Sequence, residues 1–259
     1  MIRWCSYCQK YVGEVPPLQD YSMTHTICDQ CAVSVDASED ANIQAMRQIA
    51  SFYQRLQDAS DAGDTLRASA LVDEGLGLGL RIGDLAWGML QPLLYRLGER
   101  WAAGELSVAN EHAFSAMAMS AVELLFAKDA RLQSRRQHHA PEILLVMAEE
   151  NYHTLGLCMA ELGLCLQGHT TMTVMPGLPA KEVAALVRSL KPKVLGMSVA
   201  LAPQMSSVRE VHSMLQGMQR EDRPRLAIGG SALRLGLEVP DEWGIQVVTD
   251  LTRPIVSRP

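Results

Sequence analysis

The pattern of apolar and polar positions predicts helices through the first half of the chain. From about residue 42 to residue 132, apolar residues recur at intervals of three and four, as on the buried face of an amphipathic helix. Polar or glycine-containing breaks separate four such stretches, and Asp84 and Ser107 are placed to cap the third and fourth helices. We therefore predict a four-helix bundle and assign residues 36–135 to it.

The pattern changes after a basic connector at about residues 131–140, where short apolar runs begin to alternate with longer helical segments. This alternation predicts a doubly wound parallel α/β sheet, a Rossmann-like domain, over residues 140–259. We expect strands at 143–147, 171–175, 194–199, 226–228 and 246–249, and helices at 155–167, 180–190 and 206–218.

Four of the six cysteines form two CxxC pairs near the start of the chain, separated by 19 residues: Cys5, Cys8, Cys28 and Cys31. Each pair places two thiolates on one tight turn, and two such turns complete the tetrahedral set of soft ligands that zinc prefers in closed structural sites. We therefore predict a zinc ribbon over residues 1–35, with redox thiols or an iron–sulfur cluster as the alternatives. Residues 1–40 hold two basic and six acidic side chains, which repel phosphate groups and favour a structural or protein-binding role for the ribbon.

Composition narrows the class of protein. The chain has 259 residues, 48% of them hydrophobic and 20% charged, which is typical of a globular, multidomain protein. No apolar run reaches the length of a membrane span, and the first residues lack the apolar core of a signal peptide, so we expect a cytoplasmic protein without a membrane partner. The net charge of −6 argues against nucleic acid as a direct partner.

Three unusual segments follow predicted strands of the α/β domain. In open parallel sheets, ligands bind outside the carboxyl ends of the strands, so these segments are expected to converge on one site. The candidate binding residues in them are Asn151, His153, Gly156, Ser198, Gly229 and Gly230.

The order and spacing of these residues resemble those of cobalamin-binding domains, which carry the motifs DxHxxG, SxL and GG in this order. Here 41 residues separate Gly156 from Ser198, and 28 residues separate Ala200 from Gly229. The resemblance covers roughly residues 140–259. It implies that cobalamin (vitamin B12) is the cofactor and that the sheet domain holds its lower face.

The resemblance also implies a role for each residue. His153 would displace the cofactor's own nucleotide base and coordinate cobalt from below through a neutral imidazole nitrogen. The freed nucleotide tail would enter the sheet domain beside the hydroxyl of Ser198, and Gly229 and Gly230 would let the backbone approach it closely.

Two departures from the family pattern are Asn151, where the family has Asp, and Ala200, where it has Leu. The family's Asp accepts a hydrogen bond from the far ring nitrogen of the histidine and raises its basicity. The amide oxygen of Asn151 can accept the same hydrogen bond but carries no charge, so we expect a weaker cobalt–histidine bond. Glu149 or Glu150 is the alternative partner.

The helical region carries a second resemblance. Nine residues separate Trp101 from the pair Glu111-His112, which is similar to the helical bundle of CarH-type light-sensing cobalamin regulators. This resemblance implies that Trp101 packs on an upper axial group such as adenosyl, and that Glu111 and His112 form hydrogen bonds to it. In that family a histidine directly after the Trp can bind cobalt once light breaks the cobalt–carbon bond. Ala102 stands there in this chain, so we expect no stable two-histidine capture unless His112 takes that part.

We therefore expect a sensory or regulatory protein that is not an enzyme by itself. In this hypothesis it is a light-responsive photoreceptor, binds adenosylcobalamin or methylcobalamin together with zinc, and signals through a protein partner. The alternatives are a corrinoid methyl carrier of a methyltransferase system, and a sensor that binds haem or a bilin in the same fold. An apolar helical face at Met117 and Met119 makes a homo-oligomer a further hypothesis.

Overall fold

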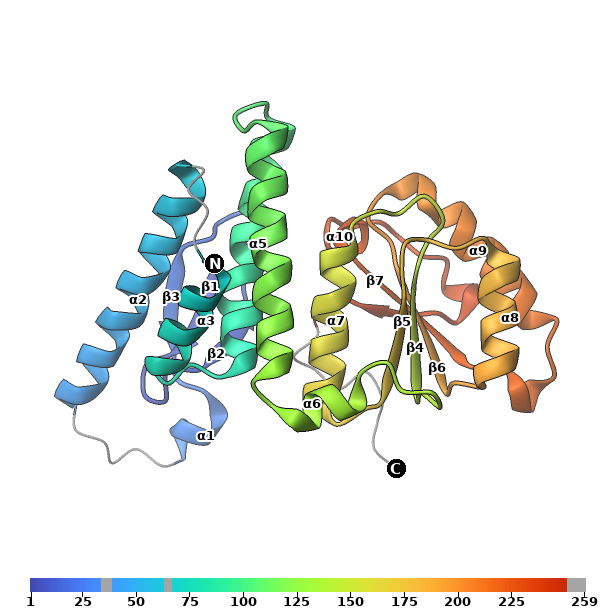
Figure 1. The fold of residues 1–259 in the computed structure, drawn as a ribbon, viewed down its shortest axis with the longest axis horizontal. Coiled ribbons are helices and arrows are strands. Elements are labelled where there is room, and N and C mark those ends of the chain that lie inside the picture. Colours follow the sequence, from blue (N-terminus) through green and yellow to red (C-terminus); the bar gives the residue numbers. More distant parts are fainter. Residues whose placement is uncertain (34–38, 63–66, 251–259) are drawn as a thin grey trace. The chain divides into compact units, whose positions relative to one another are not determined.

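The computed structural model describes residues 1–33, 39–62 and 67–250. Contacts within the chain divide it into two compact units, Met1–Lys128 (unit 1) and Asp129–Pro259 (unit 2) (Figure 1). Ribbon and bundle thus share unit 1. The three-domain division predicted above, with boundaries at 35 and 135–140, stays a prediction, and the expected linker near residue 35 lies mostly outside the described residues.

The N-terminal segment of unit 1 is a small sheet whose strand order is β2-β1-β3. The central strand β1 pairs antiparallel with β2 and parallel with β3. The first CxxC pair spans the turn after β1, and the second lies at the start of a short helix. The bounds are β1 Ile2–Cys5, β2 Tyr11–Glu14, β3 Met23–Thr26 and α1 Asp29–Ala32.

Four helices follow in unit 1, as the periodicity predicted. Their bounds are α2 Glu39–Ala62, α3 Ala68–Gly77, α4 Gln91–Ala102 and α5 Val108–Ala127. A π-helix at Asp84–Leu90, which the sequence pattern did not predict, leads directly into α4. The prediction that Ser107 caps a helix is confirmed, because its side chain accepts a hydrogen bond from the backbone N–H of Asn110 at 3.1 Å.

The prediction that Asp84 caps the third helix is wrong. The helix begins at Ile82, so Asp84 lies inside the first turn. Its carboxylate reaches back to accept the backbone N–H of Arg81 at 2.9 Å, three residues earlier. An acidic residue in this position satisfies a free N–H at the helix start from within the helix, which is the second half of a capping box.

The expected exposed methionine face on α5 is also wrong for Met117. Its side chain is buried in unit 1 together with Phe114, Val122 and Leu125, since these residues recur at helical spacing on one side of α5. Met119, the other residue of that face, is half-buried, and self-association stays a prediction. Within the described ranges, no helix is both long enough and apolar enough to cross a membrane.

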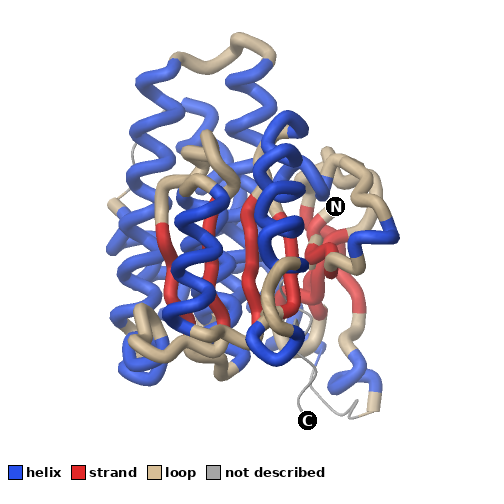
Figure 2. Tube along the Cα trace, turned by 90° about the vertical axis from the view of Figure 1, so that its right-hand side faces the viewer, coloured by secondary structure: helices blue, strands red, loops and turns tan. Residues whose placement is uncertain are grey.

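Unit 2 is a parallel sheet with strand order β5-β4-β6-β7-β8, and every neighbouring pair is parallel (Figures 1 and 2). The doubly wound α/β fold is thus confirmed. Its strands are β4 Ile143–Met147, β5 Thr171–Val174, β6 Val194–Ser198, β7 Arg225–Gly229 and β8 Gln246–Val248. Its helices are α6 Ala130–Arg135, α7 Thr154–Gln167, α8 Ala180–Leu190, α9 Met205–Gln216 and α10 Ser231–Arg234.

Alternation along each strand divides the core of unit 2 into two layers. On one face of the sheet, Leu144 and Val146 of β4 pack with apolar residues of α8 and α9. On the other face, Ile143, Leu145 and Met147 pack with residues of α7. Both faces of β4 are therefore buried, as expected for a central strand of a parallel sheet, and the loops that follow the strands are left to form a site.

Candidate functional site

The predicted binding segments meet at the carboxyl edge of the sheet, which we define as the ends of β4, β6 and β7. The last residue of β4, Met147, pairs with Ser198 at the end of β6. Ser198 in turn pairs with Gly229 at the end of β7. The three segments, separated by dozens of residues in the sequence, are therefore neighbours in the fold.

Asn151 anchors the loop that follows β4. It is completely buried, and its amide nitrogen donates to the backbone carbonyl of Ser198 at 2.9 Å. Its side-chain oxygen accepts the backbone N–H of His153 at 3.0 Å. This second contact is an Asx-turn, in which a side chain bonds to the backbone two residues on. The amide oxygen of Asn151 had been expected to accept a hydrogen bond from the ring of His153. In the structure it accepts one from the backbone N–H of His153 instead.

His153 is the residue that precedes α7, and it is exposed. Its backbone is held by Asn151, while its imidazole stands at the carboxyl edge and is open to a ligand. A neutral imidazole in such a position can coordinate a transition metal through either ring nitrogen. The arrangement is that of a fixed backbone presenting an accessible metal ligand.

Two further side chains position the same loop, and sequence reasoning missed both. Gln204 is buried; its side-chain oxygen accepts the N–H of Ala200 at 2.8 Å and its amide donates to the carbonyl of Glu150 at 3.2 Å. Ser207 accepts the N–H of Glu149 at 3.0 Å. A signal was present in the sequence, because Ser207 precedes the apolar residues Val211 and Leu215 at intervals of four and so shares their helix face.

Packing within the chain requires glycine at some positions of the site but not at others. A Cβ at Gly177 would lie 2.1 Å from the carbonyl oxygen of Ala148, so that loop packs directly on the end of β4. Gly230 has a φ of +119°, and a Cβ there would lie 2.3 Å from the carbonyl oxygen of Val199. These two glycines therefore serve the fold itself. A Cβ at Gly156, by contrast, meets nothing within 4 Å, so packing within the chain does not require glycine there.

The surroundings of His153 suit a large ligand with apolar parts. Large apolar side chains follow three successive strands at the carboxyl edge and remain exposed: Tyr152 by 75%, Met175 by 36% and Leu201 by 55%. Exposed apolar side chains gathered around a polar group mark binding sites more often than single exposed ones do.

On the sheet face that α7 covers, the positions of β6 and β7 nearest the carboxyl edge are small. By strand alternation, Gly196 and Ser198 of β6 share this face with Ala227 and Gly229 of β7. Small side chains leave room for a flat group to approach the strands. The residues present therefore fit a corrinoid, since His153 could ligate its metal and the small residues of β6 and β7 could accommodate its tail.

In unit 1, the three candidate residues flank the turn between α4 and α5. Trp101, near the end of α4, is half exposed. Glu111, in the first turn of α5, accepts a hydrogen bond from the hydroxyl of Ser115 at 2.7 Å and also contacts the imidazole of His112. Trp101 is thus an exposed aromatic residue near the end of α4, and Glu111 is an ordered, partly exposed acidic residue at the start of α5.

The four cysteines of the ribbon converge. Their sulfur atoms all lie within 4.8 Å of one another, and those of Cys8 and Cys28 are 3.7 Å apart. Tetrahedral zinc with bonds of about 2.3 Å separates its sulfur ligands by roughly 3.8 Å, so the cluster can hold a metal ion. Burial opposes ionisation of Cys5, but backbone N–H groups of Cys8 and Cys28 lower its pKa to about 6. Burial and the neighbouring sulfurs raise the pKa of Cys8 to about 12.

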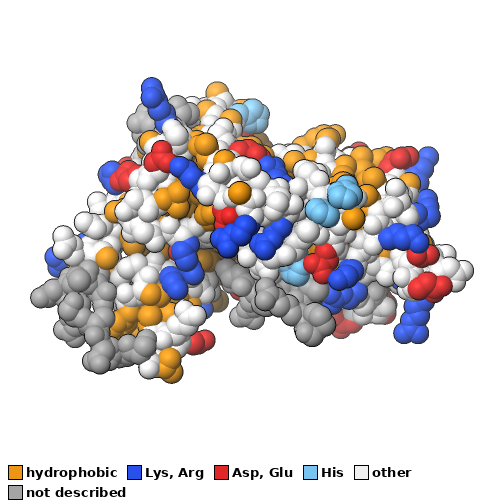
Figure 3. Space-filling view, turned by 60° about the horizontal axis from the view of Figure 1, so that its bottom comes forward, with side chains coloured by type: hydrophobic (Ala, Val, Ile, Leu, Met, Phe, Trp, Pro, Cys, Tyr) orange, Lys and Arg blue, Asp and Glu red, His pale blue; other side chains and the backbone are white. Residues whose placement is uncertain are grey.

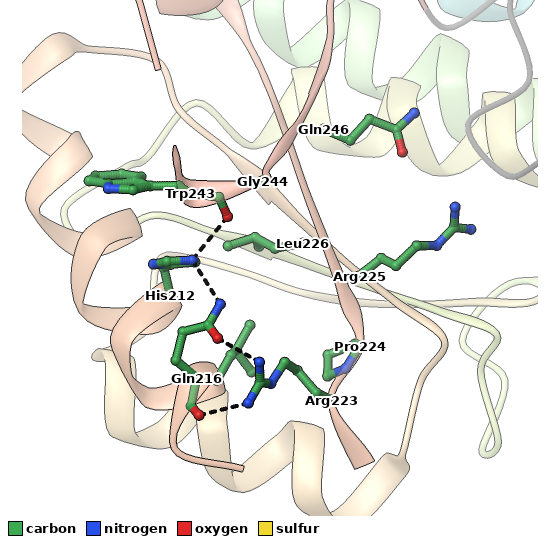
Figure 4. Close-up of a pocket in the computed structure, with 10 residues that line it drawn as sticks. His212, Gln216, Arg223, Pro224, Arg225, Leu226, Trp243, Gly244 and Gln246 are labelled. Atoms are coloured by element: carbon green, nitrogen blue, oxygen red, sulfur yellow. Dashed lines mark hydrogen bonds between the residues drawn. The ribbon is translucent and has the colours of Figure 1, made fainter. Parts of the chain in front are cut away.

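A pocket of about 180 Å³ opens between α9, β7 and the segment before β8 (Figure 4). His212 stacks on Trp243 at one side, and the guanidinium of Arg223 donates to the carbonyls of Gln216 and Met218. Those carbonyls end α9, so Arg223 caps the helix. The pocket is smaller than the 300–1,000 Å³ typical of sites for drug-sized ligands, and a corrinoid is larger still.

Charges on unit 2 are mixed in sign. The face drawn in Figure 3 shows lysine and arginine side chains interspersed with acidic ones. Several are paired, among them Lys191 with Asp222 and Lys193 with Glu142. Such a surface lacks the single sign of charge that directs a phosphate backbone to a protein.

Comparison with known proteins also indicates a cobalamin-binding module. The sequence model of the family described as "B12 binding domain" matches residues 53–126, a range that includes Trp101, Glu111 and His112. The "HTH-type transcriptional repressor CarH" of Myxococcus xanthus is 28% identical over 214 residues, which are 82% of this chain and 67% of that protein. The monomethylamine corrinoid protein of Methanosarcina barkeri has a similar fold, with a TM-score of 0.63 at 16% identity, covering 77% of this chain and 92% of that one. Residues 53–126 therefore match a B12 binding domain, and most of the chain is similar to a CarH-type protein.

Proposed function

We propose that this protein is a cobalamin-dependent sensory regulator whose cofactor is held by His153 at the carboxyl edge of the unit 2 sheet. The observation that carries the proposal is the pairing of a buried Asn151 with an exposed His153. Asn151 fixes the backbone of His153, and the imidazole of His153 is left accessible among exposed apolar side chains. The "B12 binding domain" match and the likeness to CarH support cobalamin as the ligand.

In this proposal each residue of unit 2 has a separate task. His153 coordinates the metal from below, and Asn151 fixes the direction of its backbone. Ser198 and the small residues beside it accept the nucleotide tail, and Gly156 keeps the first turn of α7 clear of the ring. The bound cofactor supplies a cobalt–carbon bond that light or redox chemistry can break.

Three residues of unit 1 are the proposed contacts of an adenosyl group on the cofactor. Trp101 offers a flat apolar surface, and Glu111 and His112 offer hydrogen-bonding groups to an adenosyl moiety. Ala102 provides no ligand for cobalt, and His112 is the residue that could serve as one in its place.

The second candidate function is a methyl carrier, favoured by the likeness in fold to a corrinoid protein. A carrier must expose the upper face of its corrin to partner enzymes. A tryptophan at position 101 opposes this, because a large aromatic residue over cobalt blocks such access. We therefore place the sensor before the carrier and regard the protein as a regulator, not an enzyme.

Signalling is proposed to pass to a protein partner, and a structural zinc ion in the four-cysteine cluster is part of the proposal. The printed name of CarH describes a transcriptional repressor, which supports a regulatory role. The acidic N-terminal segment and the mixed charges of unit 2 favour a protein over DNA as the direct partner.

Absorption spectroscopy of protein reconstituted with adenosylcobalamin tests the proposal. We expect stoichiometric binding in the dark, followed by a change of spectrum under green light that differs from photolysis of the free cofactor. Binding with photochemistry like that of the free cofactor would contradict the light-sensing part and favour the carrier. No binding of cobalamin would overturn the proposal as a whole, and titration with haem and a bilin would then follow.

A further inference from the structure

Unit 1 contains a set of contacts that joins the ribbon to the helical bundle, and none of the functions above uses it. Trp4 of β1 is completely buried and lies against the π-helix. A Cβ at Gly88 would lie 2.5 Å from the indole ring of Trp4 and 3.1 Å from the Cβ of Tyr11. The ribbon thus rests directly on the helix backbone, at a position that only glycine leaves open.

Asp84 makes a polar link at the same junction. Its carboxylate is almost completely buried and accepts the backbone N–H of Tyr11, from strand β2 of the ribbon, at 2.9 Å. The same carboxylate accepts the backbone N–H of Arg81 at 2.9 Å and its guanidinium Nε at 2.7 Å. One side chain therefore ties the start of the helix to a strand that lies 73 residues away in the sequence.

A third contact lies farther along. The hydroxyl of Tyr21, between β2 and β3, donates to the carboxylate of Glu99 in α4 at 2.7 Å. The backbone carbonyl of Tyr21 accepts a hydrogen bond from the hydroxyl of Tyr53 in α2 at 3.1 Å. The ribbon is therefore fixed to two helices of the bundle as well as to the π-helix.

The cysteines control the segments that make these contacts. Cys5 directly follows Trp4, and the backbone N–H of Cys5 donates to the carbonyl of Lys10, next to Tyr11. A segment of about 30 residues has too little core to fold alone, and metal binding supplies the missing free energy in such ribbons. Loss of the metal would therefore release Trp4 and Tyr11 from Gly88 and Asp84.

Arg81 provides a further electrostatic connection. Its pKa is raised first by its hydrogen bonds to Asp84, and further by the negative charges of Cys8 and Cys28 when these are thiolates. A metal ion with four thiolate ligands carries a net charge near −2, which a neighbouring guanidinium stabilises. The cation thus binds Asp84 at the helix start and is stabilised electrostatically by the cysteine cluster.

From this junction we infer that the metal ion of the ribbon locks the ribbon onto the π-helix, so that metal occupancy controls the rigidity of the cobalamin-binding bundle. The inference rests on the zinc ion proposed above and goes beyond it, since zinc then acts on the bundle and not only on its own ribbon. The coupling is reciprocal. If zinc raises the affinity of the bundle for a ligand by some factor, that ligand raises the affinity of the cysteines for zinc by the same factor.

Amide hydrogen exchange of the full chain tests the inference without cobalamin. Zinc-loaded protein is compared with protein treated with a chelator under reducing conditions, and then with the same protein after zinc is restored. We expect amides of residues 84–102 to exchange at least about tenfold faster without zinc, and to recover with it, while β4 and β6 of unit 2 keep their rates. Unchanged rates at residues 84–102 would overturn the inference, and so would zinc content well below one ion per chain before chelation.

A pair of glycine variants separates the lock from the folding of the ribbon itself. Gly88→Ala places a methyl group against Trp4, and we expect faster exchange at residues 84–102 while about one zinc ion per chain is retained. Gly98→Ala is the matched control on α4, because a Cβ there meets nothing within 4 Å, and it should leave exchange unchanged. Equal behaviour of the two variants would contradict the lock. A separate cobalamin titration with and without zinc reports on the proposed function, and its failure leaves the exchange result intact.

Discussion

At the residue scale, Asn151 illustrates both the reach and the limit of sequence reasoning. The spacing of the motif placed Asn151, Ser198 and Gly229 at one sheet edge, and the strand pairing agrees. The partner of the Asn151 oxygen could not be predicted, because the choice between a backbone N–H and an imidazole depends on the path of the loop. That path is set by Gln204, Ser207 and other contacts distant in the sequence.

Aspartate, which cobalamin-binding domains have at the position of Asn151, should destabilise this chain. In Asn151→Asp the carboxylate cannot donate to the carbonyl of Ser198, so that carbonyl loses its donor and a buried negative charge faces it. We expect the free energy of unfolding to fall by about 1–3 kcal/mol, measured by denaturant titration. Ser198→Ala is the control, because the hydrogen bond uses the backbone carbonyl of Ser198, and it should cost much less. An Asn151→Asp protein as stable as the wild type would refute this account.

Glu142 should make unit 2 sensitive to acid. Its carboxylate contacts Nδ1 of His169 at 2.7 Å and Nζ of Lys193 at 3.2 Å, and these partners, His169 first, lower its pKa below the usual 4.5. The pKa of Glu142 is lower in the folded state than in the unfolded state. The charged carboxylate therefore stabilises the fold above pH 4.5, and this stabilisation is lost as the pH falls through the folded-state pKa. Thermal unfolding at stepped pH should show a shallower acid decline for Glu142→Gln. The exposed Glu210→Gln variant should follow the wild type, and identical profiles for all three proteins would contradict the assignment.

At the element scale, hydrophobic periodicity predicted the helices of the bundle and the strands of the sheet within a few residues. It missed the π-helix and placed a cap at Asp84, two residues inside the true helix. The cause is a contact that the local pattern does not contain. Trp4 and Tyr11 pack on Gly88 from a segment more than 70 residues earlier, and the carboxylate of Asp84 accepts the backbone N–H of Tyr11.

Helix α7 offers a test in which stability and binding should move in opposite directions. Gly156 lies in its first turn with open space around it, so Gly156→Ala should stabilise the cofactor-free protein by up to about 1 kcal/mol through helix propensity. The same methyl group should weaken cobalamin binding, measured by absorption titration, because it projects where the corrin is proposed to lie.

Gly177→Ala is the contrasting variant. Its Cβ would collide with the carbonyl of Ala148, so stability should fall together with binding. If Gly156→Ala bound cobalamin as tightly as the wild type, the ligand would have to lie elsewhere on unit 2.

At the scale of the whole molecule, the sequence predicted a cobalamin-binding module and a four-cysteine cluster, and the first is supported by comparison with known proteins. It did not predict that the cluster and the bundle form one compact unit. Three polar or close contacts between distant segments produce that unit, and none has a local signature. The molecule therefore joins a candidate metal site and a candidate cofactor-binding bundle in one compact unit.

The central claim is that His153 is a ligand of cobalt, and electron paramagnetic resonance tests it most directly. Protein containing ¹⁵N-labelled histidine is loaded with unlabelled cobalamin and reduced to the cobalt(II) state. The account predicts that the axial nitrogen splitting changes from three lines in unlabelled protein to two in labelled protein, and that this change is lost in His153→Ala. Because His153 is exposed, that variant should keep its fold. A three-line pattern that persists in labelled protein would show that the cofactor's own base stays on cobalt, and would contradict the claim.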